Sequence, residues 1–287
     1  MKLLRVLAVA AAVAACAACG NPAGVDGDLT DDWHAMPEPH IVVPVVGTCY
    51  ISADFDLAST PTQKAPCDER HSTETVYVGQ FADRTTPPPE NGLDEQRAFA
   101  ECGKAASAYV GADWHNGPLR LLFDTPAGLE WDVGRRYYRC DLFEISSGMG
   151  HAAARTGSLK GALTGDRPLA TGCANPVGED EQKRTFDDLS RTDCTEAHRV
   201  EFTGFLIEPD SPYPPERDRT LDLHCQAKVA DFLGITAAAL RERPDVSWIA
   251  WPTDEGSWKL GDRAVYCYAI TRRPVQRSLH DLGNRRV

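Results

Sequence analysis

The sequence predicts an α+β fold made of two tandem small domains, each a largely antiparallel sheet with one packed helix and two disulfides. Two observations predict this fold. A pattern of cysteine and polar residues occurs twice, at a spacing of about one domain, and the same order of strand-like and helix-like stretches accompanies each copy. A repeat of this length is typical of a tandem duplication. Both halves are therefore expected to fold around equivalent sets of cysteines.

The repeated pattern begins with Cys-x-x-x-His-x-x-Glu and ends with Trp-x-x-Gly-x-Arg-x-x-x-Cys. Between these elements, each copy has a cysteine seven residues before an aromatic residue, with a glycine two residues after that aromatic residue. The first copy comprises Cys67, His71, Glu74, Cys102, Tyr109, Gly111, Trp131, Gly134, Arg136 and Cys140. The second copy comprises Cys194, His198, Glu201, Cys225, Phe232, Gly234, Trp258, Gly261, Arg263 and Cys267, and Cys49 and Cys173 complete the two sets of four cysteines.

The N-terminus has the features of an export signal. Lys2 and Arg5 precede an uncharged run from residue 6 to residue 15, which is shorter than the roughly 20 residues that a membrane-spanning helix needs. The run ends in a segment that resembles a bacterial lipobox, with Cys16 or Cys19 as the lipidated cysteine. Val13 favours Cys16, whereas choosing Cys19 leaves an even number of cysteines in the mature chain. Secretion without lipidation is the alternative.

The expected signal covers residues 1–19, and residues 20–41 are expected to form a flexible acidic tether. Residues 21–39 contain five acidic residues and no lysine or arginine, which favours an extended, self-repelling chain. Acylation on two or more chains gives stable anchoring. We therefore expect the protein to lie on the outer face of the cytoplasmic membrane, held there by its lipid anchor.

The net charge of the 287-residue chain is −12, which argues against nucleic acid or anionic lipid as the main partner. The exception is residues 272–287, where five arginines face a single aspartate. This segment is expected to be a basic C-terminal tail that is solvated and frayed, with contact to lipid headgroups or an acidic partner as the alternative.

Eight cysteines outside the signal of an exported protein are expected to form disulfides. The third cysteine of each half lies on the apolar stripe of a helix-like stretch, and the fourth lies in a strand-like run. This setting favours Cys102 with Cys140 and Cys225 with Cys267, which leaves Cys49 with Cys67 and Cys173 with Cys194. Four cysteines allow three connectivities in each half, and the sequence does not choose among them rigorously.

The predicted order of elements in each half is strand, strand, helix, strand, strand. Gly111 and Gly234 follow the helices at the position of a left-handed cap. The Trp-x-x-Gly-x-Arg element is expected to be a hairpin turn before the last strand, in which Gly134 and Gly261 have positive φ and the tryptophans cover the core. The expected domains are residues 42–150 and 169–271, joined by a linker over residues 151–168.

The combined pattern resembles the septum-formation domain family of actinobacterial exported and membrane proteins, over roughly residues 42–143 and again 170–270. The resemblance implies an envelope role linked to cell division. It implies no catalytic residue for this sequence. The chain departs from an even repeat in its first cysteine spacing, which is eighteen residues in one half and twenty-one in the other.

Cys-x-x-x-His-x-x-Glu is the candidate for chemistry that occurs in both halves. A histidine beside a carboxylate could act as a general base, or the three side chains could hold zinc. However, an oxidised cysteine cannot bind a metal ion, and no second pair of ligands at metal spacing accompanies the element. A hydrolase site is suggested by Ser146, Ser147, Gly148 and His151. These residues have no counterpart in the second half.

These observations favour a non-enzymatic binding or scaffold module for an unidentified envelope or division protein, with no catalytic residue, no metal and no cofactor. The residues expected to support the fold or contact the partner are His71, Glu74, His198 and Glu201. The alternative is an envelope hydrolase or a metal-dependent enzyme that uses the repeated His/Glu element. That alternative predicts that His71 and Glu74 line an open pocket.

Overall fold

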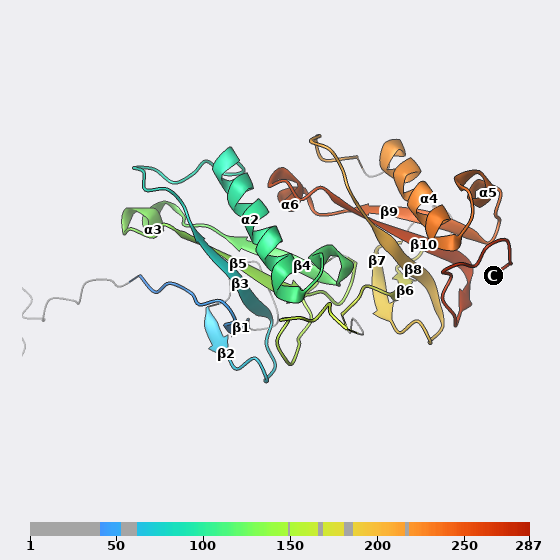
Figure 1. The fold of residues 1–287 in the computed structure, drawn as a ribbon, viewed down its shortest axis with the longest axis horizontal. Coiled ribbons are helices and arrows are strands. Elements are labelled where there is room, and N and C mark those ends of the chain that lie inside the picture. The colour runs from blue at the N-terminus through green and yellow to red at the C-terminus, as the bar shows by residue number, and fades with distance from the viewer. Residues whose placement is uncertain (1–40, 53–61, 149, 166–168, 181–185, 216–217) are drawn as a thin grey trace, which may run out of the picture. The chain divides into compact units, whose positions relative to one another are not determined.

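The computed structural model describes residues 41–52, 62–148, 150–165, 169–180, 186–215 and 218–287. Residues 41–287 belong to one compact unit (Figure 1). The predicted signal, Cys16, Cys19 and nearly all of the predicted tether lie outside the described residues. None of the helices in the described part of the chain combines the length and the apolar character needed to cross a bilayer.

The first half of the unit is an antiparallel five-stranded sheet with the strand order β2-β1-β3-β5-β4. The helix α2 crosses one face of this sheet (Figure 1). The elements are β1 (Cys49–Ile51), β2 (Gln63–Ala65), β3 (Thr73–Gln80), α2 (Leu93–Val110), η2 (Trp114–Asn116), β4 (Leu119–Asp124), α3 (Gly128–Asp132) and β5 (Tyr137–Glu144).

The second half repeats this arrangement, with an antiparallel sheet in the equivalent order β7-β6-β8-β10-β9 and the helix α4 packed against it. The elements are β6 (Cys173–Val177), β7 (Asp188–Thr192), β8 (His198–Ile207), α4 (Arg219–Leu233), α5 (Ala237–Arg241), β9 (Val246–Pro252), α6 (Glu255–Lys259) and β10 (Ala264–Val275). The predicted α+β fold with two sheet-bearing halves is therefore confirmed.

The two long helices form where the spacing of apolar residues predicts them. Cys102 in α2 and Cys225 in α4 lie on the buried stripes, and both are 0% exposed. Gly111 and Gly234 end the helices with φ of 89° and 70°, which a residue with a Cβ rarely adopts. The N-terminus of α4 is capped by the Asp218 carboxylate, which accepts hydrogen bonds from two backbone N–H groups.

Four disulfides join the eight cysteines in the pairs that the sequence favours. Cys102–Cys140 and Cys225–Cys267 connect the central helix of each half to its last strand, inside the two hydrophobic cores. Cys49–Cys67 and Cys173–Cys194 connect the first strand of each half to the loop before the third strand. Each half thus has one buried cross-link through its core and one at its edge.

The two edge disulfides are expected to be reduced before the core disulfides when the folded protein is treated with dithiothreitol. Thiol–disulfide exchange requires a thiolate to reach a sulfur, and Cys67 and Cys194 are partly exposed, whereas all four core cysteines are 0% exposed. Alkylation followed by mass spectrometry would report the order. Simultaneous loss of all four disulfides would contradict this expectation.

The Trp-x-x-Gly-x-Arg turns differ in part from the prediction. Trp131 and Trp258 lie in the short helices α3 and α6, so the connection before the last strand is a helical turn and not a simple hairpin turn. Gly134 and Gly261 have the predicted positive φ, at 96° and 104°. The tryptophans are 1% and 2% exposed, so their predicted packing against the core is confirmed. Each sheet also contains one more strand than predicted, namely β2 or β7.

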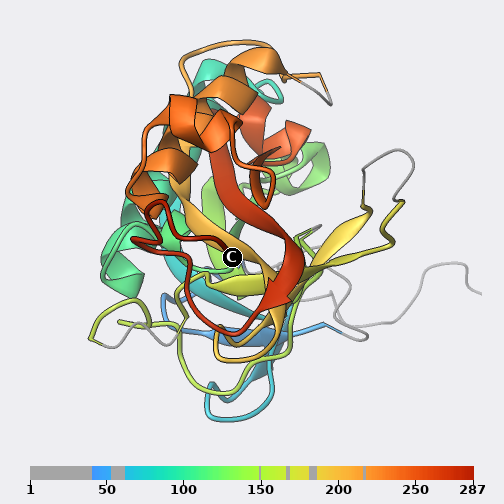
Figure 2. The same cartoon turned by 90° about the vertical axis from the view of Figure 1, so that its right-hand side faces the viewer.

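The segments that follow the two sheets pack on the cores. In the first half, the expected linker contributes Leu159 and Leu163, which are 1% and 2% exposed. In the second half, β10 continues to residue 275, and Leu279 and Leu282 are 0% and 2% exposed. The C-terminal segment turns back beside α4 (Figures 1 and 2), so residues 272–287 do not form a frayed basic tail. Burial of its leucines holds the segment in place.

Candidate functional site

The carboxylate of Glu74 holds the segment that follows the first sheet. Glu74 lies in β3, and its side chain is 0% exposed. Its Oε1 accepts a hydrogen bond from the Ser158 hydroxyl at 2.6 Å, and its Oε2 accepts one from the Leu159 N–H at 2.6 Å. The Tyr109 hydroxyl also donates to Oε1. Burial and the hydrogen bond to Glu74 together raise the pKa of Tyr109 to about 12, so its hydroxyl stays protonated and donates.

Glu201 makes the same arrangement in the second half. Its Oε1 accepts from the Ser278 hydroxyl at 2.5 Å, and its Oε2 accepts from the Leu279 N–H at 2.6 Å. Tyr109 is replaced there by Phe232, which has no hydroxyl to donate. We call the two sets carboxylate clamps: Glu74 with Ser158 and Leu159, and Glu201 with Ser278 and Leu279. Both clamps hold a Ser-Leu segment against the end of the central helix.

Backbone hydrogen bonds extend each clamp. In the first half, the Gly161 and Leu163 N–H groups donate to the last carbonyls of α2, at 2.8 and 2.9 Å. In the second half, the Asp281 and Gly283 N–H groups donate to the equivalent carbonyls of α4, at 3.0 and 2.8 Å. The Ser-Leu pair that recurs after each copy of the repeat, Ser158-Leu159 and Ser278-Leu279, was the sequence signal that could have predicted this role.

The two histidines of the repeat are also buried. His71 and His198 are each 0% exposed, and each Nδ1 faces a backbone carbonyl two residues earlier, at 2.9 and 2.8 Å. These carbonyls can only accept, so each Nδ1 carries the proton. Within the described part of the chain, neither Nε2 has a hydrogen-bond partner. The geometry does not support a hydrolase that uses His71 and Glu74, because these residues do not line an open pocket.

The burial of these four side chains also bears on the predicted partner contact. Glu201 is the most exposed of them, at 6%. A partner that binds the surface of this unit cannot reach side chains with so little exposed area. The structure therefore places His71, Glu74, His198 and Glu201 in the interior, where they support the fold.

The repeated sulfur and carboxylate atoms lie close together without forming a metal site. Cys49, Cys67 and Glu74 have potential ligand atoms within 4.8 Å of one another, as do Cys173, Cys194 and Glu201. Each pair of sulfurs is joined in a disulfide and offers no thiolate. Each carboxylate already accepts hydrogen bonds through both oxygens. These donor sets do not fit a bound metal ion while the cysteines are oxidised.

Ser147 and His151 come together as the sequence suggested, but their geometry is not that of a catalytic relay. The Ser147 hydroxyl lies 2.9 Å from His151 Nδ1, and Asp188 Oδ2 lies 3.7 Å from the same nitrogen. A relay needs the serine and the carboxylate on different ring nitrogens. His151 is also 74% exposed, so its imidazole is not held in place by burial.

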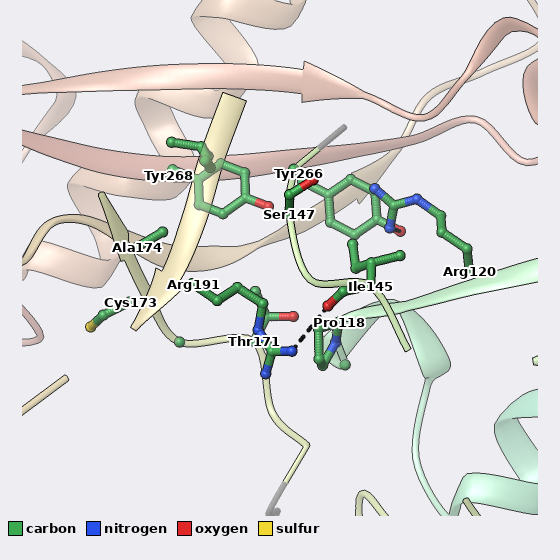
Figure 3. Close-up of a pocket in the computed structure, with 14 residues that line it drawn as sticks. Pro118, Arg120, Ile145, Ser147, Thr171, Cys173, Ala174, Arg191, Tyr266 and Tyr268 are labelled. Atoms are coloured by element: carbon green, nitrogen blue, oxygen red, sulfur yellow. Dashed lines mark hydrogen bonds between the residues drawn. The ribbon is translucent and has the colours of Figure 1, made fainter. Parts of the chain in front are cut away.

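A small pocket lies between residues of the two halves, and we call it the seam pocket (Figure 3). Its volume is about 30 Å³, which is enough for a water molecule or the end of a side chain. The residues that give it its chemistry are Arg120, Ser147, Gly172, Arg191, Tyr266 and Tyr268. The lining includes two arginines and no aspartate or glutamate. One of these arginines, Arg191, is paired with Glu144 beside the pocket.

The two arginines of the seam pocket already donate to groups of the chain itself. The Arg120 guanidinium lies 4.8 Å from the centre of the Tyr266 ring and donates to the Tyr266 hydroxyl at 3.3 Å. Arg191 donates to the Ile145 carbonyl at 3.0 Å, the bond drawn as a dashed line in Figure 3, and pairs with Glu144 at 2.9 Å. Burial raises the pKa of Tyr268 to about 12, so its hydroxyl is protonated at neutral pH.

Comparison with known proteins places the chain in a family. A family model described as septum formation matches residues 46–267, which is more than half of the chain. The chain belongs to the septum formation family. No curated protein and no solved structure matches the chain. The predicted resemblance to this family is confirmed, as a single match that spans both halves, and it supports a role related to the septum or the cell envelope.

In this member of the septum formation family, His115 joins the two halves. Its Nε2 lies 3.1 Å from the Asp262 carboxylate of the second half, and its Nδ1 lies 2.7 Å from Asp113. The ring stacks on Trp114, with ring centres 3.8 Å apart. Asp262 lies at the position that Arg135 occupies in the first copy of the repeat. This change from a basic to an acidic residue was the sequence signal that could have predicted the contact.

The bridge made by His115 is expected to stabilise the protein more in mild acid than in base. Burial alone would lower the pKa of His115, but its hydrogen bonds and ion pairs with Asp113 and Asp262 outweigh burial and raise this pKa above the ordinary value. The contribution of protonated His115 to the free energy of unfolding is therefore complete below about pH 6.5, the ordinary histidine pKa. It is lost as the pH rises through the higher pKa that His115 has in the folded protein.

Urea unfolding of His115→Asn and of the unsubstituted protein at several pH values would check this. The difference in free energy of unfolding should be larger at pH 6 than at pH 9. His151→Asn, at an exposed histidine, is the matched control and should show little dependence on pH. A difference for His115→Asn that grows toward pH 9 would contradict the sign of the effect.

Proposed function

We propose that this member of the septum formation family is an exported lipoprotein that binds a protein of the envelope or the division apparatus and catalyses no reaction. The observation that supports the proposal most is the position of the repeated polar residues in the interior. Both carboxylate clamps and both histidines are buried and engaged in holding the fold. The residues that occur in both copies of the repeat therefore stabilise the fold. This is what we expect of a protein that presents a rigid surface to a binding partner.

The seam pocket is the place where we propose that the partner makes its polar contact. Its lining contains the Arg120 guanidinium and the Tyr268 hydroxyl, which can both donate, and Arg191, which is paired with Glu144. Donors of this kind bind carboxylates well, and arginine gives the strongest hydrogen bonds to them. The pocket admits only a small group, so the partner would contribute a single acidic side chain or a chain terminus. The surrounding surface would supply the remaining contact area.

Affinity capture from the membrane fraction tests the binding role. Arg120→Gln and Tyr268→Phe should each lower capture of the partner at least tenfold, because a hydrogen bond to a charged group contributes about 1.5–3 kcal/mol and each 1.4 kcal/mol is about tenfold. Tyr213→Phe is the matched control, since Tyr213 packs on Trp258 at the surface outside the seam pocket. Unchanged capture by both pocket variants would reject this contact.

Anchoring by Cys16 or Cys19 is proposed from the N-terminal sequence, and we place the protein on the outer face of the cytoplasmic membrane. Substituting serine at the lipidated cysteine should release the protein from the membrane fraction and abolish incorporation of labelled palmitate. Substitution at the other cysteine should change neither result. If the Cys16→Ser, Cys19→Ser double variant still incorporates palmitate, the proposed anchor is wrong.

A further inference from the structure

Exposed aliphatic side chains gather where the described part of the chain begins. The exposed fractions are 41% for Ile41, 70% for Val42 and 54% for Val43. Leu129 and Val133, from α3 and the residue after it, are 83% and 60% exposed. We call these five residues the N-terminal patch. Single exposed apolar residues are ordinary, but a cluster of them marks a surface that is covered by something else.

Contacts in the structure join the two parts of the N-terminal patch. The Ile41 Cδ1 atom lies 3.4 Å from the position that a Cβ would take on Gly134, directly after Val133. The Tyr137 hydroxyl donates to the Val42 carbonyl at 3.1 Å. Leu129 and Val133 are four residues apart, so they share one side of the helical turn. Figure 1 shows α3 and the segment leading to β1 at the same end of the unit.

The position of the patch in the chain indicates what covers it. Residues 1–40 precede it, and in our proposed function they carry the lipid anchor and the tether. A tether that emerges from the patch keeps the patch near the membrane. The arginines beside the patch are engaged by acidic side chains: Arg135 pairs with Asp124 and Glu130, and Arg136 pairs with Asp83. The surface therefore offers aliphatic contact and little uncompensated positive charge.

We propose that the N-terminal patch docks on the lipid surface of the membrane that holds the anchor. This inference rests on the proposed anchoring, and it adds that the folded unit itself touches the bilayer. The aliphatic side chains would enter the boundary between headgroups and acyl chains, as the apolar side of a peripheral membrane protein does. Because the chain is acidic overall, binding is expected to depend on apolar contact and not on anionic lipid.

The test uses the chain from Gly20 onward, which lacks Cys16 and Cys19 and cannot be acylated. All eight remaining cysteines are in disulfides. The chain should float with phosphatidylcholine vesicles, and adding phosphatidylglycerol should not strengthen the binding. The Leu129→Ser, Val133→Ser double variant should lower the vesicle partition coefficient at least tenfold. Leu223→Ser, at a residue of α4 that is 48% exposed, is the matched control and should leave it unchanged.

A fluorescent label reports the site of contact. An environment-sensitive dye on Leu129→Cys should shift to the blue with vesicles, and the same dye on Leu223→Cys should not. The proposal is overturned if the chain from Gly20 onward does not bind vesicles, or if both labels respond equally. It is also overturned if the double variant loses self-association and keeps vesicle binding. The N-terminal patch would then be covered by a second copy of the protein and not by lipid. Failure here leaves the anchor itself intact, because that is tested by palmitate incorporation in the full chain.

Discussion

Replacing Glu201 by alanine is expected to lower the free energy of unfolding by about 2 kcal/mol. The substitution leaves the buried Leu279 N–H without its acceptor, which costs about 1–3 kcal/mol, whereas Ser278 is exposed and its hydroxyl can donate to water instead. The C-terminal segment, which the clamp holds against α4, should detach first. Urea unfolding would measure the loss, and hydrogen exchange at Leu279 would show whether the segment opens.

Two variants serve as controls for this prediction. Glu201→Gln keeps one oxygen acceptor and should lose less stability than the alanine variant. Glu196→Ala changes an exposed glutamate in the loop before β8 and should have little effect. A loss below 1 kcal/mol for Glu201→Ala, with Leu279 still protected from exchange, would show that the clamp does not hold the segment.

Removing the core disulfide Cys225–Cys267 is expected to cost about 4 kcal/mol. The two cysteines are 42 residues apart, and chain entropy predicts a cost of this size for a loop of that length. Both are 0% exposed, so replacing them by alanine also leaves a small space in the core. The Cys225→Ala, Cys267→Ala double variant would be compared with the unsubstituted protein by urea unfolding under non-reducing conditions.

The edge disulfide of the same half is the matched comparison. Cys173 and Cys194 are 21 residues apart, so the same reasoning predicts a cost of about 3 kcal/mol for their removal. The core variant should therefore lose more stability than the edge variant. If the core variant unfolds at the same urea concentration as the unsubstituted protein, the bridge between α4 and β10 does not contribute to the folded state as described.

Much of the fold could be predicted because its determinants are local or repeated. Cys102 lies on a regular apolar stripe, and a helix of this kind buries one side against a sheet. Gly111 marks the end of that helix because its positive φ suits a residue without Cβ. The helix and strand setting of the cysteines favoured the disulfide pairs that the structure contains, and the duplication showed each feature twice.

The features that were missed depend on short elements or on distant residues. The helices α3 and α6 have five residues each, which is too short to show a helical period. The strand β2 has three residues and little alternation. Glu74 and Ser158 are 84 residues apart, and Glu201 and Ser278 are 77 residues apart, so no local pattern connects either pair.

The candidate site was harder to predict than the fold. The repeated histidines and glutamates stood out in the sequence, but the structure places them in the interior. The seam pocket combines Arg120 of β4 with Tyr268 of β10 and Arg191 of β7, which only the folded chain brings together. These positions are not duplicated, because the equivalent strands of the two halves carry different side chains. A search for repeated residues could not find a site that both halves build jointly.

The most direct test of the central claim is partner capture per folded molecule by the His71→Gln, His198→Gln double variant. We claim that the repeated polar residues support the fold and that the partner binds elsewhere. The double variant should therefore unfold at a lower urea concentration, and its folded molecules should capture the same partner in the same amount as the unsubstituted protein. Loss of capture with stability unchanged would contradict this account.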